Sequence, residues 1–131
     1  MTIEFRYLTY AAALGLLHLI AASHAISSQY GYRWTASTRE QPMPPLKGVA
    51  NRIDQACTNF LETFPIFAAL VMVAHLTGRN GELTTLGARL YFWARIAYAS
   101  ASVAGFSLVR SLIWNIALIG MGLIVFAIVW G

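Results

Sequence analysis

The sequence predicts an all-α integral membrane protein, folded as a four-helix up-and-down bundle. Hydrophobic residues make up 58% of the 131 residues and charged residues only 11%, whereas ordinary soluble domains are about a quarter charged. The chain also divides into four long apolar stretches joined by polar ones, and ~20 apolar residues suffice to cross a bilayer. We therefore expect a single membrane domain over residues 1–131.

The first helix is expected at about residues 5–26. No charged residue lies between Tyr7 and Tyr32, and the apolar part of this stretch has the length of one membrane crossing. The alternative is a secretory signal, with Arg6 as its basic end and a cleavage site at residues 23–25. That cleavage site is weak, which favours a retained helix.

The second helix is expected at about residues 49–76, after a polar connection at residues 27–47. Three prolines disfavour helix in that connection, and they are Pro42, Pro44 and Pro45. At ~1.5 Å per residue the second helix is longer than the ~30 Å hydrocarbon core, so its charged first turns should project beyond the lipid. Pro65 should bend this helix, which membrane helices tolerate.

The third and fourth helices are expected at about residues 83–103 and 108–130. The Asn-Gly dipeptide within residues 78–81 predicts a turn before the third helix, and Gly105 separates it from the fourth. Short connections favour antiparallel neighbours. The sequence therefore predicts an up-and-down arrangement.

Two polar stripes run along the predicted helices. Residues spaced three, four, three and four apart share one helix face, and in the second helix these are Arg52, Gln55, Asn59, Glu62 and Ile66. Residues spaced four, three and four apart form a similar stripe in the third helix, namely Tyr91, Arg95, Tyr98 and Ser102. A charge exposed to lipid costs at least ~2.5–3.5 kcal/mol, so both stripes must meet protein or water.

The distribution of Lys and Arg predicts the orientation of the chain. The side of the first and third connections holds five of them, namely Arg33, Arg39, Lys47, Arg52 and Arg110, and the opposite side holds Arg6 and Arg79. We therefore expect both termini outside the cytoplasm and the long first loop inside. This orientation also places Arg52, Arg110 and Tyr98 at the same cytoplasmic level, which makes a site there the best-supported interpretation.

The residues on this face suit a small zwitterionic ligand rich in carboxylates. Arg52 and Arg110 could pair with carboxylates, Glu62 with an amino group and Asn59 with peptide groups. Two plainer interpretations remain open. Glu62 could form a structural ion pair with Arg89 or Arg95, and Arg110 could be a cationic anchor at the lipid headgroups.

Composition argues against a nucleic-acid partner, an intrachain disulfide and a metal site. The net charge of +4 comes from scattered residues without a Lys/Arg run, so we expect no nucleic-acid partner. A single cysteine, Cys57, excludes an intrachain disulfide. Three histidines lie too far apart for a ligand motif, so we expect no metal, and they are His18, His24 and His75.

The sequence resembles the MAPEG family, the membrane-associated proteins of eicosanoid and glutathione metabolism. The pattern Asn-x-x-Glu-x-x-Pro at residues 59–65 resembles the second-helix signature of that family. The stretches ARLYFWARIAYAS and LVRSLIWN resemble its third and fourth helices. The resemblance covers nearly the whole chain and is closest to the short bacterial members. It implies a homotrimer in a bacterial inner membrane, with glutathione bound between subunits near the cytoplasmic face.

The resemblance also implies roles for individual residues. Asn59, Glu62 and Tyr98 match glutathione-contacting positions, Arg110 matches the thiolate-stabilising arginine, and Arg52 matches a basic position of the second helix. Gln55 and Arg95 are further candidate binding residues on the two stripes. The chain departs from the family pattern at three positions, with Gln55 in place of an arginine and with Thr63 and Ser102 in place of tyrosines.

The expected activity is a glutathione-dependent transferase or peroxidase. A free thiol has a pKa near ~8.5, so a positioned guanidinium, for which Arg110 is the candidate, must favour the thiolate near neutral pH. The thiolate would attack an apolar electrophile or reduce a lipid hydroperoxide arriving from the bilayer. One alternative is a non-catalytic MAPEG-like protein that binds lipid or partner proteins. Another is a small proton-coupled multidrug transporter with Glu62 as its coupling acid, which neighbouring arginines would neutralise.

Overall fold

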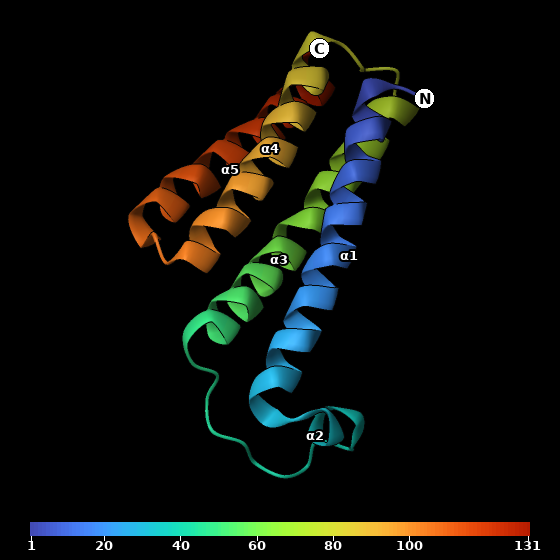
Figure 1. Ribbon diagram of the computed structural model, residues 1–131. Helices are drawn as coiled ribbons and strands as arrows, with labels where there is room; N and C mark the ends of the chain where they lie inside the picture. The colour runs from blue at the N-terminus through green and yellow to red at the C-terminus, as the bar shows by residue number, and fades with distance from the viewer.

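The structure, a computed structural model, describes residues 1–131 and contains four long helices, one short helix and no strand (Figure 1). The all-α prediction is confirmed. The helices are α1 (Ile3–Tyr30), α2 (Tyr32–Ala36), α3 (Gly48–Leu76), α4 (Glu82–Ala104) and α5 (Ser107–Trp130). The four long helices correspond to the four predicted ones, with ends that differ by four residues at most.

The prediction was incomplete for the first connection. α1 continues to Tyr30, and α2 occupies part of the segment that was predicted to be a loop. The prolines disfavour helix only from Pro42 onward, and residues 27–36 contain no proline. The break between α1 and α2 is set by Gly31, whose φ of +95° is readily accessible only to glycine. The chain therefore contains five helices instead of four.

The long helices are arranged as two pairs, α1 beside α3 and α4 beside α5 (Figure 1). Both termini and the α3–α4 connection lie at one end of the bundle, and α2 with the long loop lies at the other. The α4–α5 turn also points toward the α2 end. This is the up-and-down order that the short connections predict.

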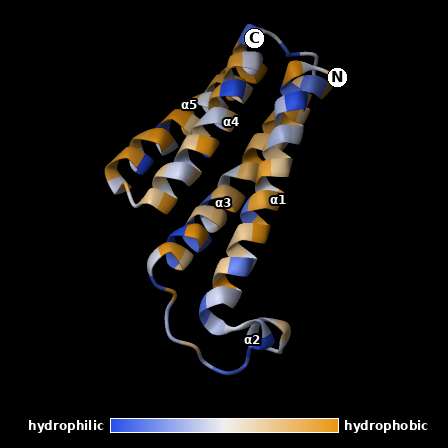
Figure 2. Cartoon of the chain, in the orientation of Figure 1, coloured by the Kyte–Doolittle hydropathy of each residue, from blue (hydrophilic) through white to orange (hydrophobic).

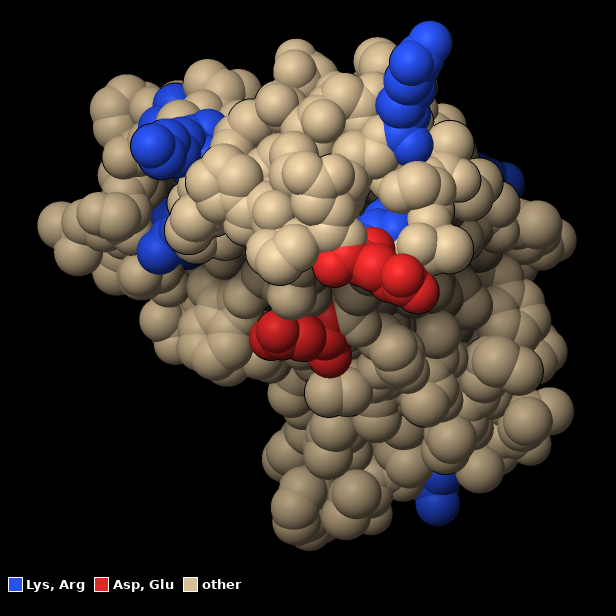
Figure 3. All heavy atoms as spheres, turned by 90° about the horizontal axis from the view of Figure 1, so that it is seen from below, with Lys and Arg blue, Asp and Glu red and all other residues tan.

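The surface of the chain is largely apolar. α1, α3 and α5 are each long and apolar enough to cross a membrane. α4 is the least apolar of the long helices, because it carries Glu82, Arg89 and Arg95. Figure 2 shows apolar residues along most of the long helices, and Figure 3 shows only small groups of charged side chains on the α2 end. Such a surface suits lipid better than water.

The stripe predicted along the third helix is buried inside the bundle. Its four members are at most 7% exposed, and they are Tyr91, Arg95, Tyr98 and Ser102. The Tyr91 ring stacks on Phe67 of α3 with ring centroids 4.0 Å apart, and its hydroxyl is 2.9 Å from the Thr63 hydroxyl. Thr63 therefore joins α3 to α4, which explains a small hydroxyl residue at this position.

We expect Thr63→Val to lower the free energy of unfolding by about 1 kcal/mol. The substitution keeps the volume of the side chain but leaves the buried Tyr91 hydroxyl without its partner on α3, and an interhelical hydrogen bond contributes roughly this amount. Thermal unfolding in detergent measures the effect. Thr58→Val, at an exposed position of the same helix, is the control, and equal effects of the two substitutions would contradict the assignment.

α4 and α5 approach so closely that their backbones are in contact. A Cβ atom added at Gly120 would lie 2.7 Å from the carbonyl oxygen of Gly87 and 3.0 Å from the backbone nitrogen of Tyr91. Both glycines are buried. Small residues at such crossings allow membrane helices to approach closely and gain van der Waals contact. This contact fixes where α5, and with it Arg110, lies against α4.

Candidate functional site

A polar pocket of about 390 Å³ lies where α3, α4 and α5 meet. Its lining includes Asn59 from α3, Tyr98 from α4 and Arg110 from α5. Tyr98 and Arg110 are two of the residues that the sequence placed at one level, and Asn59 belongs to the predicted polar stripe of the second helix. The pocket also takes in three residues of α5 that were not predicted to belong to the site, namely Ser111, Trp114 and Asn115.

A second, smaller pocket of about 130 Å³ adjoins the first, because Arg110 lines both. Arg52 and Gln55 of α3 face it, together with Ser102 of α4 and the α4–α5 turn. Its polar lining contains two arginines and no acidic residue. This pocket can therefore attract an anion, with Arg110 positioned between the two spaces.

Arg52 also joins α3 to the end of α4. Its Nε donates a hydrogen bond to the carbonyl oxygen of Val103 at 3.0 Å, just before Gly105 ends the helix in a left-handed conformation. The last carbonyls of a helix lack partners within the helix, and a cation is favoured at that negative end of the helix dipole. Arg52 thus stabilises the α4 terminus while it lines the pocket.

Arg95 lies behind the pocket and does not line it. It has no exposed surface, and none of its three guanidinium nitrogens has a hydrogen-bond partner in the chain. The guanidinium lies 4.2 Å from the ring centroid of Tyr98 and 5.6 Å from that of Phe60. Cation–π attraction of this kind contributes roughly 2 kcal/mol or more away from water. Arg95 therefore supports the Tyr98 ring from inside the bundle.

Glu62 is exposed and lines neither pocket. The alternative of an ion pair between Glu62 and Arg95 is wrong for this chain, because the Arg95 guanidinium has no partner. Arg89 lines a different pocket, at the end of the bundle that holds the termini. The α3 stripe turns outward instead, with Gln55 and Glu62 both exposed on the surface of the single chain.

A comparison with protein families completes this description. The family model of MAPEG matches residues 7–130, nearly the whole chain. The chain belongs to the MAPEG family. Together with its apolar helices, this membership makes the protein an integral membrane protein of a family concerned with glutathione-related transferase and peroxidase chemistry. A comparison with curated proteins found no match.

Within this MAPEG protein, the sequence analysis missed three pocket residues of α5, namely Ser111, Trp114 and Asn115. Trp114 lines the pocket, and its Nε1 is buried and lacks a hydrogen-bond partner. Trp114 follows Arg110 by four residues and therefore shares its helix face. That spacing was the available signal. Asn115 points its amide nitrogen at the Ser111 carbonyl oxygen, 2.9 Å away.

Proposed function

We propose that this MAPEG protein is a glutathione-dependent membrane transferase or peroxidase that acts on apolar electrophiles or lipid hydroperoxides. The observation that carries the proposal is the position of Arg110. It lies between two polar pockets, with Asn59 and Tyr98 in one and Arg52 in the other. A guanidinium in this position is suited to hold a negative charge on a bound ligand.

The polar groups of the two pockets are complementary to those of glutathione. The tripeptide carries two carboxylates, an ammonium group, two peptide groups and a thiol. Arg52 and Arg110 can pair with anionic groups, and two buried atoms without partners, Asn59 Oδ1 and Trp114 Nε1, can accept from and donate to peptide groups. A buried polar atom without a partner costs roughly 1–3 kcal/mol. A ligand that satisfies these atoms would recover that cost.

We also propose that the protein is a homotrimer, and the exposed polar residues of the α3 stripe support this. Gln55 and Glu62 are exposed on the single chain although α3 is a membrane-crossing helix. Because a charge facing lipid is costly, these side chains are expected to face a neighbouring subunit or the ligand. We propose that glutathione binds between subunits, with its amino group at Glu62. The proposed orientation places this end of the bundle at the cytoplasmic face of a bacterial inner membrane.

In the proposed reaction the thiol of glutathione loses its proton, and Arg110 stabilises the resulting thiolate. The thiolate attacks an apolar electrophile, a carbon–sulfur bond forms, and the leaving group departs with its electron pair. With a lipid hydroperoxide, two glutathione molecules supply two electrons. The products are then the lipid alcohol, water and glutathione disulfide. Tyr98 and Asn59 hold the tripeptide in place, and Arg95 holds the Tyr98 ring.

The proposal predicts a saturable thiolate absorbance when the purified protein is titrated with glutathione at neutral pH. The measurement is an ultraviolet difference spectrum in detergent, together with the heat of binding. S-methylglutathione, which has no ionisable thiol, is the control ligand and should bind without the absorbance change. Neither absorbance nor heat with glutathione would overturn the proposal. That outcome would favour a non-catalytic MAPEG protein, in which Gln55 in place of an arginine has abolished the affinity.

A further inference from the structure

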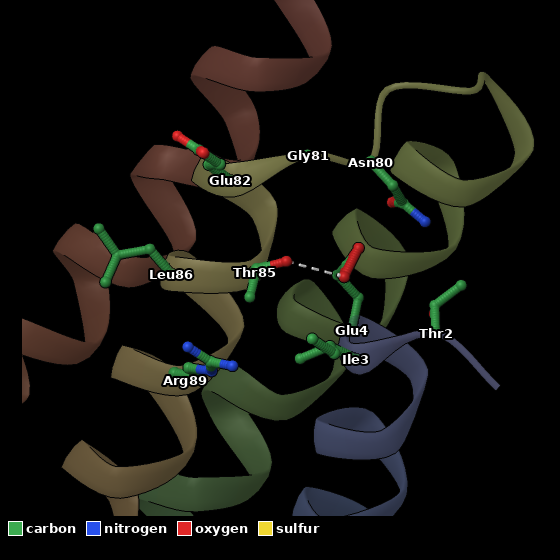
Figure 4. Close-up of a pocket in the computed structure, with 9 residues that line it drawn as sticks. All are labelled: Thr2, Ile3, Glu4, Asn80, Gly81, Glu82, Thr85, Leu86 and Arg89. Atoms are coloured by element: carbon green, nitrogen blue, oxygen red, sulfur yellow. Dashed lines mark hydrogen bonds between the residues drawn. The ribbon is translucent and has the colours of Figure 1, made fainter.

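A third polar pocket, of about 590 Å³, lies at the opposite end of the bundle from Arg110. It is formed between the start of α1, the start of α4 and the connection that precedes α4 (Figure 4). Its polar lining includes Glu4 of α1, Asn80 of the connection, and Thr85 and Arg89 of α4. None of these residues takes part in the proposed reaction, so the pocket needs a separate explanation.

The pocket lies at the depth of the lipid headgroups. Its residues come from the first turns of α1, which begins at Ile3, and of α4, which begins at Glu82. At ~1.5 Å per residue, the 23 residues of α4 span ~35 Å. This is only slightly longer than the ~30 Å hydrocarbon core. The first turns of α4 are therefore expected just outside the hydrocarbon, where headgroups carry their charges.

Glu4 is an unusual feature of this pocket because it is a buried carboxylate. Only 4% of its surface is exposed. Its hydrogen-bond partners are two hydroxyl groups of α4, Thr85 at 3.1 Å and Thr84 at 3.4 Å (Figure 4 shows the first). Neither partner carries a positive charge. A buried carboxylate without a cation is costly, so Glu4 favours a cationic group in the pocket.

Three other groups complete the chemistry of the pocket. Asn80 Oδ1 is buried and has no hydrogen-bond partner, so it is a second acceptor beside Glu4. Arg89 is exposed and lies on the same face of α4 as Thr85, four residues further along. Glu82, an exposed residue at the start of α4, also lines the pocket. The pocket thus offers Glu4, Glu82 and Asn80 Oδ1 as acceptors for a cation and one guanidinium for an anion. Groups of both signs are therefore present, and they can pair with both charges of a zwitterion.

We propose that this pocket binds the headgroup of a zwitterionic phospholipid that carries a primary ammonium group, as in phosphatidylethanolamine. The ammonium group donates hydrogen bonds to Glu4 and Asn80, and the phosphate accepts from Arg89. A quaternary ammonium headgroup has no N–H to donate and is recognised less well. The site would bind lipid in the leaflet on the side of the chain termini, independently of glutathione.

The test is a binding titration of the full-length protein in detergent, followed by native mass spectrometry. The probes are dihexanoyl phosphatidylethanolamine, phosphatidylcholine and phosphatidylglycerol, with water-soluble phosphoethanolamine as the free headgroup. We expect the ethanolamine lipid to bind most tightly. Glu4→Gln keeps an acceptor for Thr85. It should lower the affinity for the ethanolamine lipid by about tenfold or more, since a hydrogen bond to a charged group contributes roughly that factor.

Arg89→Gln should lower the affinity for all three lipids alike, because each lipid contains the phosphate. Two exposed residues that lie outside this pocket provide the matched controls, Glu40→Gln and Arg6→Gln, and neither should change binding. Equal affinity of wild type for the ethanolamine and choline lipids would overturn the proposal. Free phosphoethanolamine binding as tightly as the lipid would also overturn it, in favour of a soluble zwitterion.

Using both Glu4→Gln and Arg89→Gln keeps the test decisive even if one variant fails to fold. Glu4 is buried, so Glu4→Gln is first checked by thermal unfolding. If that variant does not fold, Arg89→Gln decides alone, because Arg89 is exposed and unchanged binding of all three lipids would contradict the proposal. Since no arm uses glutathione, the outcome is separate from that of the proposed enzymatic function.

Discussion

Arg110→Gln is expected to lower kcat for glutathione conjugation by about 10²–10³-fold, the range seen when one group that stabilises a developing anion is removed. The substitution should also raise the pKa of the bound thiol and so abolish the thiolate absorbance at neutral pH. Glutathione binding should weaken less than turnover falls, because Asn59, Tyr98 and Arg52 remain. Steady-state kinetics and the difference spectrum measure both effects.

The pH–rate profile separates a chemical role of Arg110 from a merely structural one. If Arg110 holds the thiolate, activity of Arg110→Gln should recover partly as the pH rises toward ~8.5, where free thiols ionise without help. Arg6→Gln, which removes an exposed arginine in the first turn of α1, is the control and should leave the profile unchanged. Full activity of Arg110→Gln at neutral pH would refute the assignment.

Gly120→Val is expected to destabilise the protein by about 3 kcal/mol or more, at the upper end of the range for overpacked sites. The new side chain would meet the Gly87 carbonyl and the Tyr91 backbone nitrogen, which cannot move aside as a flexible side chain could. α4 and α5 must then separate. We expect the midpoint of thermal unfolding in detergent to fall by ~10 °C, since ~1 kcal/mol corresponds to several degrees in a small domain.

A neighbouring glycine of the same helix provides a matched control. Nothing lies within 4 Å of a Cβ atom added at Gly122, so Gly122→Ala should leave stability unchanged or raise it, since alanine favours helix by up to ~1 kcal/mol over glycine. Gly120→Val should also weaken glutathione binding, because the α4–α5 contact positions Arg110 against Tyr98. If Gly120→Val is as stable as wild type, the backbone contact does not hold the pair together.

The predicted positions of the four long helices were close to those observed because each helix has a strong local cause. Apolar runs of membrane-crossing length and the glycines of the turns fix where helices begin and end. The error lay at residues 27–36, where no proline or long apolar run gives a local signal. α2 there follows a turn at Gly31, whose φ is positive.

The candidate site could be predicted only in part. Counting Lys and Arg placed Arg110, Arg52 and Tyr98 at one level, and the structure brings Arg110 together with each of the other two in a pocket. Helical spacing also showed correctly that Arg95 and Tyr98 share a face. It did not reveal that this face is buried, with Arg95 packed on the inner side of the Tyr98 ring.

The sequence by itself determined the helical membrane class, the extent of the long helices, the family and which residues share a stripe, because these properties depend on local composition and periodicity. Only the tertiary structure decided which side chains contact one another across the helices. Arg52 meets Val103, Thr63 meets Tyr91 and Glu4 meets Thr85, pairs that are 28 or more residues apart in the chain. Such contacts depend on how closely helices approach one another, which local composition does not fix. Between α4 and α5 that approach is set by the absence of side chains at Gly87 and Gly120.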